Sequence, residues 1–139
     1  MTFDLLTLGR TLKQVQYKHH RLLDTRLNEI GISLTQWDAL RAIGSQPDSS
    51  AHALAQATFQ TDQAFSTLAG RLLQRGWIQR IAGPGRAIRH RLTASGRTIL
   101  TKGHAVASEA LAESFVSLSH VERGQLQGLL ERTLESSEH

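Results

Sequence analysis

The stretch DQAFSTLAGRLLQRGWIQRIAGPGRAIRHRL, residues 62–92, changes its apolar period part-way along. Over the first half, Phe65, Leu68 and Leu72 recur at steps of three and four residues, which predicts a helix with a buried stripe and a polar outer face. Over the second half, apolar residues alternate with arginines around a turn at residues 83–85, which predicts a two-stranded hairpin. The stretch therefore predicts a helix followed at once by a basic hairpin.

The sequence on both sides of this stretch has the period of helices. Ser33 with Gln36, and Ser119 with Glu122, have the spacing of capping boxes, which mark helix beginnings. The expected caps of the two short helices are Ser49 or Ser50 and Thr61, and the expected stops are Gly31, Pro47 and Gly76. We expect helices over residues 5–30, from residue 33 to Pro47, and over residues 51–58, 62–75, 93–116 and 119–134.

Two short helices, the second polar on its outer face, and then a basic hairpin are the layout of a winged helix-turn-helix. The chain has 139 residues, of which 40% are hydrophobic, so it has room for one domain. We expect a mainly α fold with a small β-hairpin. Residues 32–93 would form the DNA-binding lobe, and residues 1–31 and 94–139 a helical dimerisation region, because the apolar stripe of the first helix is too long for one small lobe to cover.

The charges of the chain are unevenly distributed. Residues 63–108 contain 8 basic and no acidic residues, whereas the rest of the chain contains 8 basic and 12 acidic residues. A cationic middle with acidic flanks predicts a polyanionic partner for the middle. The alternative from charge alone is a solvated basic surface without a partner.

Several classes of function are unexpected. The chain has no cysteine, so it has no disulfide, thiolate zinc site or cysteine nucleophile. We expect no metal, because the adjacent His19 and His20 would point about 100° apart on a helix. We expect no cofactor and no enzyme activity, since phosphate-loop and nucleophile motifs are missing. Without a signal segment or a long apolar run, we expect a soluble cytoplasmic protein that does not associate with membranes.

Four segments carry a family resemblance: ISLTQWDALRAI (32–43), HALAQATF (52–59), LLQRGWIQR (72–80) and HRLTASG (90–96). In this order and spacing, over roughly residues 30–100, they resemble successive signatures of the MarR family of bacterial transcriptional regulators. The resemblance implies a homodimer, joined by the first and last helices, that binds a pseudo-palindromic double-stranded DNA operator and often represses. It also implies that a small aromatic or phenolic ligand reduces the affinity for the operator.

The candidate DNA-binding residues lie on the predicted recognition helix and hairpin: Gln63, Ser66, Thr67, Arg71, Arg86, Arg89 and Arg91. Gln63 is suited to adenine, and Arg71 to guanine or a phosphate, while Arg86 would reach the minor groove from the wing tip. The alternatives are an ordinary polar helix face and strand arginines that pair with acidic residues of neighbouring elements.

The chain departs from the family pattern at the wing. The family's Asp-x-Arg element has Pro84 at its acidic position and Arg86 at its basic one, and the acidic residue common before the helix arginine is Gly70. Thr67 stands where many relatives have a basic residue. We therefore expect a wing without its usual electrostatic brace, stiffened instead by proline, and a DNA affinity that depends mainly on the wing.

In this family the ligand pocket lies between the first two helices and the DNA-binding lobe. Tyr17, His20, Trp37 and Arg41 are the candidates for its aromatic walls and its anchor for a carboxylate, with a purely structural core role as the alternative for Trp37. A second function stays open from the sequence: a winged-helix interaction module whose basic face binds an acidic protein without reading DNA sequence.

Overall fold

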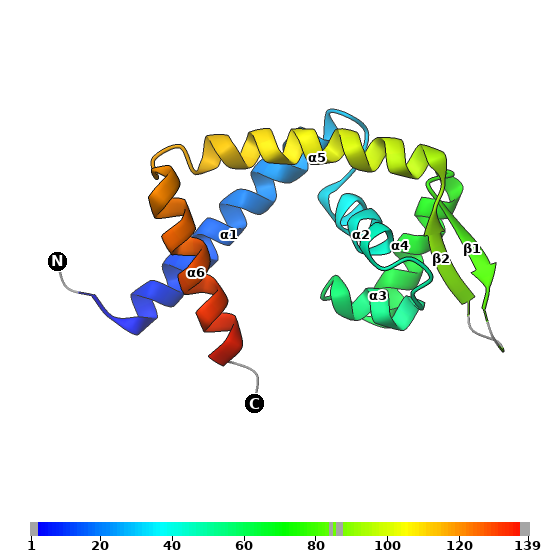
Figure 1. Cartoon of the computed structure of the whole chain (residues 1–139), viewed down its shortest axis with the longest axis horizontal. Coiled ribbons are helices and arrows are strands. Elements are labelled where there is room, and N and C mark those ends of the chain that lie inside the picture. The colour runs from blue at the N-terminus through cyan, green and yellow to red at the C-terminus, as the bar shows by residue number, and fades with distance from the viewer. Residues whose placement is uncertain (1–2, 84, 86–87, 137–139) are drawn as a thin grey trace.

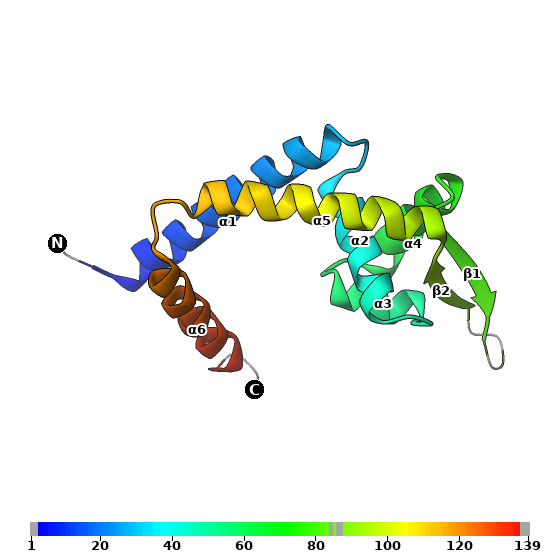
Figure 2. The ribbon, with the colours of Figure 1, turned by 45° about the horizontal axis from the view of Figure 1, so that its top comes forward.

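The structure, a computed structural model, describes residues 3–83, 85 and 88–136. Its elements in order are α1 (Leu5–Asn28), α2 (Leu34–Ser45), α3 (Ala51–Ala57), α4 (Asp62–Gln74), β1 (Ile78–Ala82), β2 (Ile88–Leu92), α5 (Ala94–Ser114) and α6 (His120–Ser136). Figures 1 and 2 show α2 to α4 and the hairpin gathered under the N-terminal half of α5, while α6 and both termini lie at the opposite end of the molecule. The predicted mainly α fold with a small hairpin is confirmed.

The helices begin where their caps predict. The Ser33 hydroxyl accepts from the Gln36 backbone N–H (3.1 Å), and the Gln36 side chain accepts from the Ser33 N–H (3.0 Å). Ser119 and Glu122 form the same reciprocal pair, at 3.1 and 2.8 Å. Of the two candidate caps for α3, the structure uses Ser50. Each such cap contributes about 1 kcal/mol, so local chemistry defines the helix starts.

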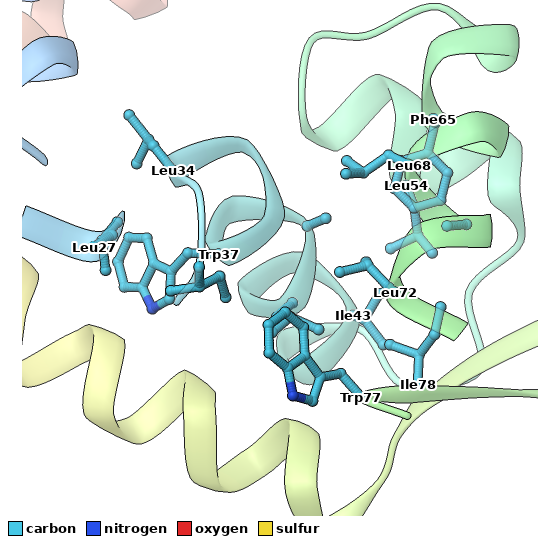
Figure 3. Packing of buried hydrophobic residues seen from close by; sticks show 14 of the residues in the cluster. Leu27, Leu34, Trp37, Ile43, Leu54, Phe65, Leu68, Leu72, Trp77 and Ile78 are labelled. Carbon is cyan, nitrogen blue, oxygen red and sulfur yellow. The ribbon is translucent and has the colours of Figure 1, made fainter. Parts of the chain in front are cut away.

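The core lies where α2, α3, α4 and the hairpin meet. Phe65 and Leu72 of α4 are fully buried against Leu54 of α3 and Ile43 of α2, as the apolar spacing predicts (Figure 3). Full burial of one such side chain contributes roughly 1.5–3 kcal/mol. Because this stripe of α4 is buried, its opposite face is left for solvent.

Two glycines let α5 lie directly on the two tryptophans. A Cβ at Gly96 would lie 2.0 Å from the Trp77 carbonyl oxygen, and a Cβ at Gly103 would lie 2.4 Å from Cδ1 of Trp37. The Trp37 indole N–H donates to the carbonyl of Leu100, also on α5, at 3.3 Å. The long helix α5 is thereby joined closely to α2 and to the start of the hairpin.

The far end of the molecule is incompletely packed. α1 packs along α5, and the Arg26 guanidinium lies 2.6 Å from the Glu113 carboxylate, but within the described residues α6 packs extensively against no other element. Large apolar side chains of α1 and α6 are exposed to solvent: Leu5, Leu6, Leu8, Leu12, Val15, Val121, Leu129, Leu130 and Leu134. An exposed apolar surface of this extent is typical of a protein interface.

Candidate nucleic-acid interface

The outer face of α4 is polar, as predicted. Gln63, Ser66, Thr67 and Arg71 are all exposed, because their positions lie opposite the buried stripe. The Thr67 hydroxyl donates to the Gln63 carbonyl at 3.1 Å. Arg75, which caps α4, is engaged elsewhere: its guanidinium donates to the Gly31 carbonyl at 2.9 Å. Arg71 is therefore the arginine that α4 presents on this face.

The hairpin packs against α4 through its first strand, β1. β1 and β2 are antiparallel, with Ile78 opposite Leu92 and Ala82 opposite Ile88. Arg80 is exposed and Arg89 half-buried. The alternation of buried and exposed residues on β2 holds for His90 and Leu92 but not for Ile88, which is 53% exposed at the strand end next to the turn. The predicted tip residues Pro84 and Arg86 lie outside the described residues.

An ion pair braces the base of the hairpin. The Arg91 guanidinium donates to both carboxylate oxygens of Asp48, in the loop between α2 and α3. Asp48 has a left-handed backbone (φ 66°), and the hydrogen bonds from Arg91 hold the pKa of its carboxyl below the ordinary value. The sequence made Arg91 a candidate for DNA contact, with pairing to an acidic residue of a neighbouring element as the alternative, and the structure shows such a pair. The pair lies at the base of the hairpin, whereas the brace that the sequence lacks belongs to the wing tip at Pro84, outside the described residues.

His90 joins the hairpin to α4 from the inside. Its side chain is 2% exposed, its ring meets that of Phe65 edge to face at 6.2 Å, and Nδ1 donates to the Ser49 carbonyl at 3.4 Å. Burial lowers the pKa of the His90 imidazole, and the nearby Arg80 charge lowers it further, against the opposing effect of the Ser49 hydrogen bond. The neutral imidazole thus fits this site better than the cation.

A cavity of about 1070 Å³ lies between α1, α2, α5 and α6. Of the four predicted pocket residues, His20, Trp37 and Arg41 line it and Tyr17 does not. Tyr17 is 60% exposed and lies under the Arg21 guanidinium, 5.8 Å from its ring centroid, because its position on α1 turns away from α2. Trp37 belongs to the core as well as to the cavity wall.

The polar groups that α2 contributes to this cavity are Asp38 and Arg41, and α1 and α6 contribute others, among them His19 and Arg132. The Arg41 guanidinium lies 5.2 Å from the Trp37 ring centroid. The half-buried Asp38, which sequence reasoning missed, also lines the wall, and burial raises the pKa of its carboxyl against the lowering effect of Arg41 and His20. The rest of the lining is largely apolar, with Leu12, Leu23 and Phe115 among its members. Such a cavity suits an apolar ring that carries an anionic group.

Comparisons with known proteins identify the family. A family model described as the MarR family matches residues 30–87. A probable transcriptional regulator from Pseudomonas aeruginosa of known structure is 31% identical, with a TM-score of 0.80 over 90% of this chain and 95% of that chain. The chain belongs to the MarR family.

Two further family members are informative. A mutant MarR from Escherichia coli, solved in complex with operator DNA, superposes with a TM-score of 0.85 at 25% identity, over 95% of this chain and 99% of that chain. The transcriptional repressor Rv2887 of Mycobacterium tuberculosis is 29% identical over 93% of this chain and 94% of its own length. Its structure with salicylic acid has a TM-score of 0.78 at 26% identity, over 95% of this chain and 97% of that chain.

The described residues offer neither a membrane span nor a cluster of metal ligands. None of their helices combines the length and the apolar character that crossing a bilayer requires. Among the same residues, no three His, Asp or Glu side chains are grouped so that they could hold a metal ion. The α4 face, the hairpin and the cavity make up the candidate site.

The burial of His90 predicts a pH-dependent stability. In the unfolded chain its pKa returns to about 6.5, so below that pH the unfolded state binds a proton that the folded state resists. We expect the free energy of unfolding to be undiminished by this group above pH 6.5 and to fall as the pH drops from 6.5 towards 5, by at most about 1.4 kcal/mol per pH unit. Urea unfolding at a series of pH values measures this slope.

His90→Gln should flatten that slope, and His104→Gln, which changes an exposed histidine of α5, should leave it unchanged. His19 contributes in the same direction, because burial also lowers its pKa, so part of the slope remains in the His90 variant. An identical slope in wild type and His90→Gln would contradict the assigned role of His90.

Proposed function

We propose that this chain is a sequence-specific DNA-binding transcriptional regulator that acts as a homodimeric repressor in the cytoplasm. The observation that carries the proposal is the exposed polar face of α4 beside a basic hairpin paired to Asp48, in a chain whose residues 63–108 include no acidic residue. The complex of the Escherichia coli relative with operator DNA supports it. The relative Rv2887 is a transcriptional repressor and the Pseudomonas aeruginosa relative a probable transcriptional regulator, which argues against enzyme activity.

In this proposal α4 enters the major groove and the hairpin approaches the neighbouring backbone. Gln63 is suited to adenine and Arg71 to guanine, with each good bidentate contact worth ~1–3 kcal/mol of discrimination. Arg89 and the tip residue Arg86 are assigned to phosphates or the minor groove, and each phosphate contact releases counterions. Arg91 supports binding indirectly, because Asp48 holds its guanidinium at the base of the hairpin.

The dimer is proposed from the exposed apolar surfaces of α1 and α6. α6 packs extensively against no other element of the described chain, so a partner is the natural source of its missing contacts. Residues 1–31 and 94–139 would form the dimerisation region and residues 32–93 the DNA-binding lobe. A dimer that reads successive major grooves must hold its two recognition helices about 34 Å apart, which matches a pseudo-palindromic operator.

A small aromatic or phenolic effector is proposed for the cavity. Arg41 can hold a carboxylate, and Trp37 and the apolar lining can hold a ring. The salicylic acid complex of the relative Rv2887 supports this choice. The cavity lies between the dimerisation helices and α2 of the DNA-binding lobe, so a bound ligand would shift the equilibrium between two spacings of the recognition helices. The free energy of this shift is limited by the difference in the ligand's affinity for the two spacings.

The first test is binding to DNA from upstream of the chain's own gene, measured by fluorescence anisotropy with excess random duplex. We expect preference for one duplex, and Arg71→Gln should weaken that binding by about tenfold, because it removes an exposed cation from the α4 face. Lys18→Gln removes one charge from the exposed side of α1 and should change affinity little. Affinity equal for specific and random duplexes would favour the protein-binding module instead.

Dimerisation is tested by sedimentation equilibrium. Leu129→Glu places a charge on the exposed apolar surface of α6 without disturbing the core, so we expect the dimer to dissociate while the helical content is retained. Gln127→Glu adds the same charge to the opposite side of the helix and should remain dimeric. A wild-type chain that stays monomeric at micromolar concentration would refute the dimer and the operator geometry that depends on it.

The effector is tested with salicylate in the same anisotropy assay. We expect salicylate to release the chain from DNA, and Arg41→Gln to raise the required concentration about tenfold, because a charge-assisted hydrogen bond is lost. Arg21→Gln is the matched control, since Arg21 lies on α1 over Tyr17 and does not line the cavity. Equal salicylate sensitivity in both variants would show that Arg41 is not the anchor.

A further inference from the structure

Phe59 lies in the turn between α3 and α4 in a conformation that is unfavourable in two ways. Its side chain is 97% exposed, so the ring gains almost nothing from the core. Its backbone is left-handed (φ 57°), a region in which a side chain with a Cβ is strained and glycine is not. A glycine would be more favourable here on both counts, so the stability of the fold does not account for phenylalanine at this position.

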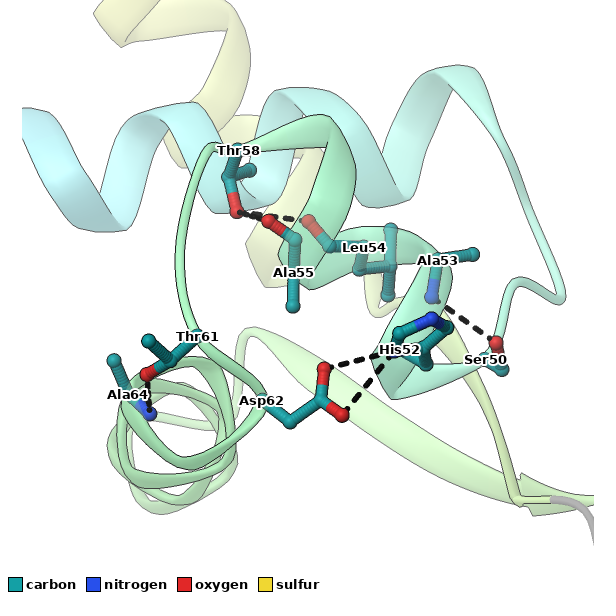
Figure 4. A network of polar contacts seen from close by, with 9 residues as sticks. All are labelled: Ser50, His52, Ala53, Leu54, Ala55, Thr58, Thr61, Asp62 and Ala64. Carbon is teal, nitrogen blue, oxygen red and sulfur yellow. Dashed lines mark hydrogen bonds and ion pairs between the residues drawn. The ribbon is translucent and has the colours of Figure 1, made fainter.

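Hydrogen bonds and an ion pair stabilise the turn between α3 and α4, in which Phe59 lies (Figure 4). The Thr58 hydroxyl donates to the Leu54 carbonyl at 2.8 Å, and the Gln60 backbone N–H donates to the Ala55 carbonyl at 2.8 Å. On the other side of the turn, His52 Nδ1 lies 2.9 Å from a carboxylate oxygen of Asp62, the first residue of α4. The ring is thus presented on a fixed turn and not on a loose loop.

Phe59 also lies at the end of α4 that matters for reading DNA. Residues at the N-terminus of a recognition helix make the base-edge contacts, and Phe59 stands three residues before Asp62, where α4 begins. Of the other large apolar side chains that are exposed in the described chain, all except Ile88 belong to α1, α6 and the residues next to these helices, so the Phe59 ring is not part of that apolar surface. The large exposed apolar surface of the molecule is on α1 and α6, at the other end.

We propose that the Phe59 ring packs against the 5-methyl group of a thymine at the edge of the major groove that α4 enters, and so selects that base in each half-site. Thymine is the one base that presents a methyl group in this groove, and apolar side chains such as phenylalanine read it by contact. The charge of the segment that follows, with 8 basic and no acidic residues over residues 63–108, complements the DNA backbone around the contact. This contact rests on the proposed DNA-binding function.

The test begins with selection of a preferred duplex from a randomised library by the wild-type protein. Each thymine of that duplex is then replaced singly by deoxyuridine, which removes only the 5-methyl group. We expect one thymine per half-site at which the replacement weakens wild-type binding about fourfold, the equivalent of ~0.8 kcal/mol for one buried methyl-sized group. Phe59→Gly should bind the unmodified duplex about fourfold more weakly than wild type does. Replacement of the same thymine by deoxyuridine should then cause no further loss of affinity in this variant.

Stability is measured on the same variants, because it separates a contact from a folding defect. Phe59→Gly and Phe59→Asn both suit a left-handed backbone and should raise the melting temperature by a few degrees while lowering DNA affinity. Phe59→Leu keeps an apolar side chain and should retain part of the response to deoxyuridine. A gain in stability together with a loss of binding is the result expected for a residue that contacts DNA.

Two outcomes overturn the proposal in distinguishable ways. If the library yields an enriched duplex but Phe59→Gly binds it as tightly as wild type, or responds to deoxyuridine as wild type does, the thymine contact is wrong and the DNA-binding function stands. If no duplex is enriched, the proposed function itself fails and the contact fails with it.

Discussion

The burial of one stripe of α4 orients the surface on which the proposed function depends. Phe65 and Leu72 are fully enclosed by α2, α3 and the hairpin, so the helix cannot rotate about its axis without exposing them. The opposite face, with Gln63 and Arg71, is thereby directed outward. The same core residues that stabilise the lobe therefore determine which side chains a partner meets. A change in core packing would alter recognition even though no residue of the outer face is substituted.

The hairpin is positioned by interactions of a different kind. β1 and β2 form a two-stranded sheet, which is marginal by itself in water, and backbone hydrogen bonds and two side-chain contacts from the loop between α2 and α3 support it. The Ser49 carbonyl accepts from the buried imidazole of His90, and Asp48 pairs with Arg91 at the surface. One contact is buried and sensitive to protonation, whereas the other is exposed and weakened by salt. The hairpin thus depends on a short loop whose contacting residues lie 41 and 43 positions away in the sequence.

Sequence reasoning succeeded where the signal is local. The capping boxes at Ser33 and Ser119, the stop at Gly31 and the buried stripe of α4 each involve residues within one or two helical turns, so their spacing carries the information. It reached less far where the partner is distant or the geometry is tertiary: it left pairing with an acidic residue open for Arg91 without naming Asp48, and it placed Tyr17 in a cavity that Tyr17 does not line. The left-handed Phe59 was also missed, since nothing in the residue type indicates a positive φ.

The cavity and the proposed dimer surface share residues, which links two parts of the proposed mechanism. Leu12, Leu129 and Leu130 line the cavity and are also among the exposed apolar residues of α1 and α6. Because α6 packs extensively against no other element of the described chain, a partner subunit would determine how tightly it closes over the cavity. Ligand affinity and dimer affinity are then thermodynamically coupled, and each must change the other by the same factor. An effector that fits the closed cavity would strengthen the dimer even while it weakens DNA binding, so release from DNA does not require dissociation of the subunits.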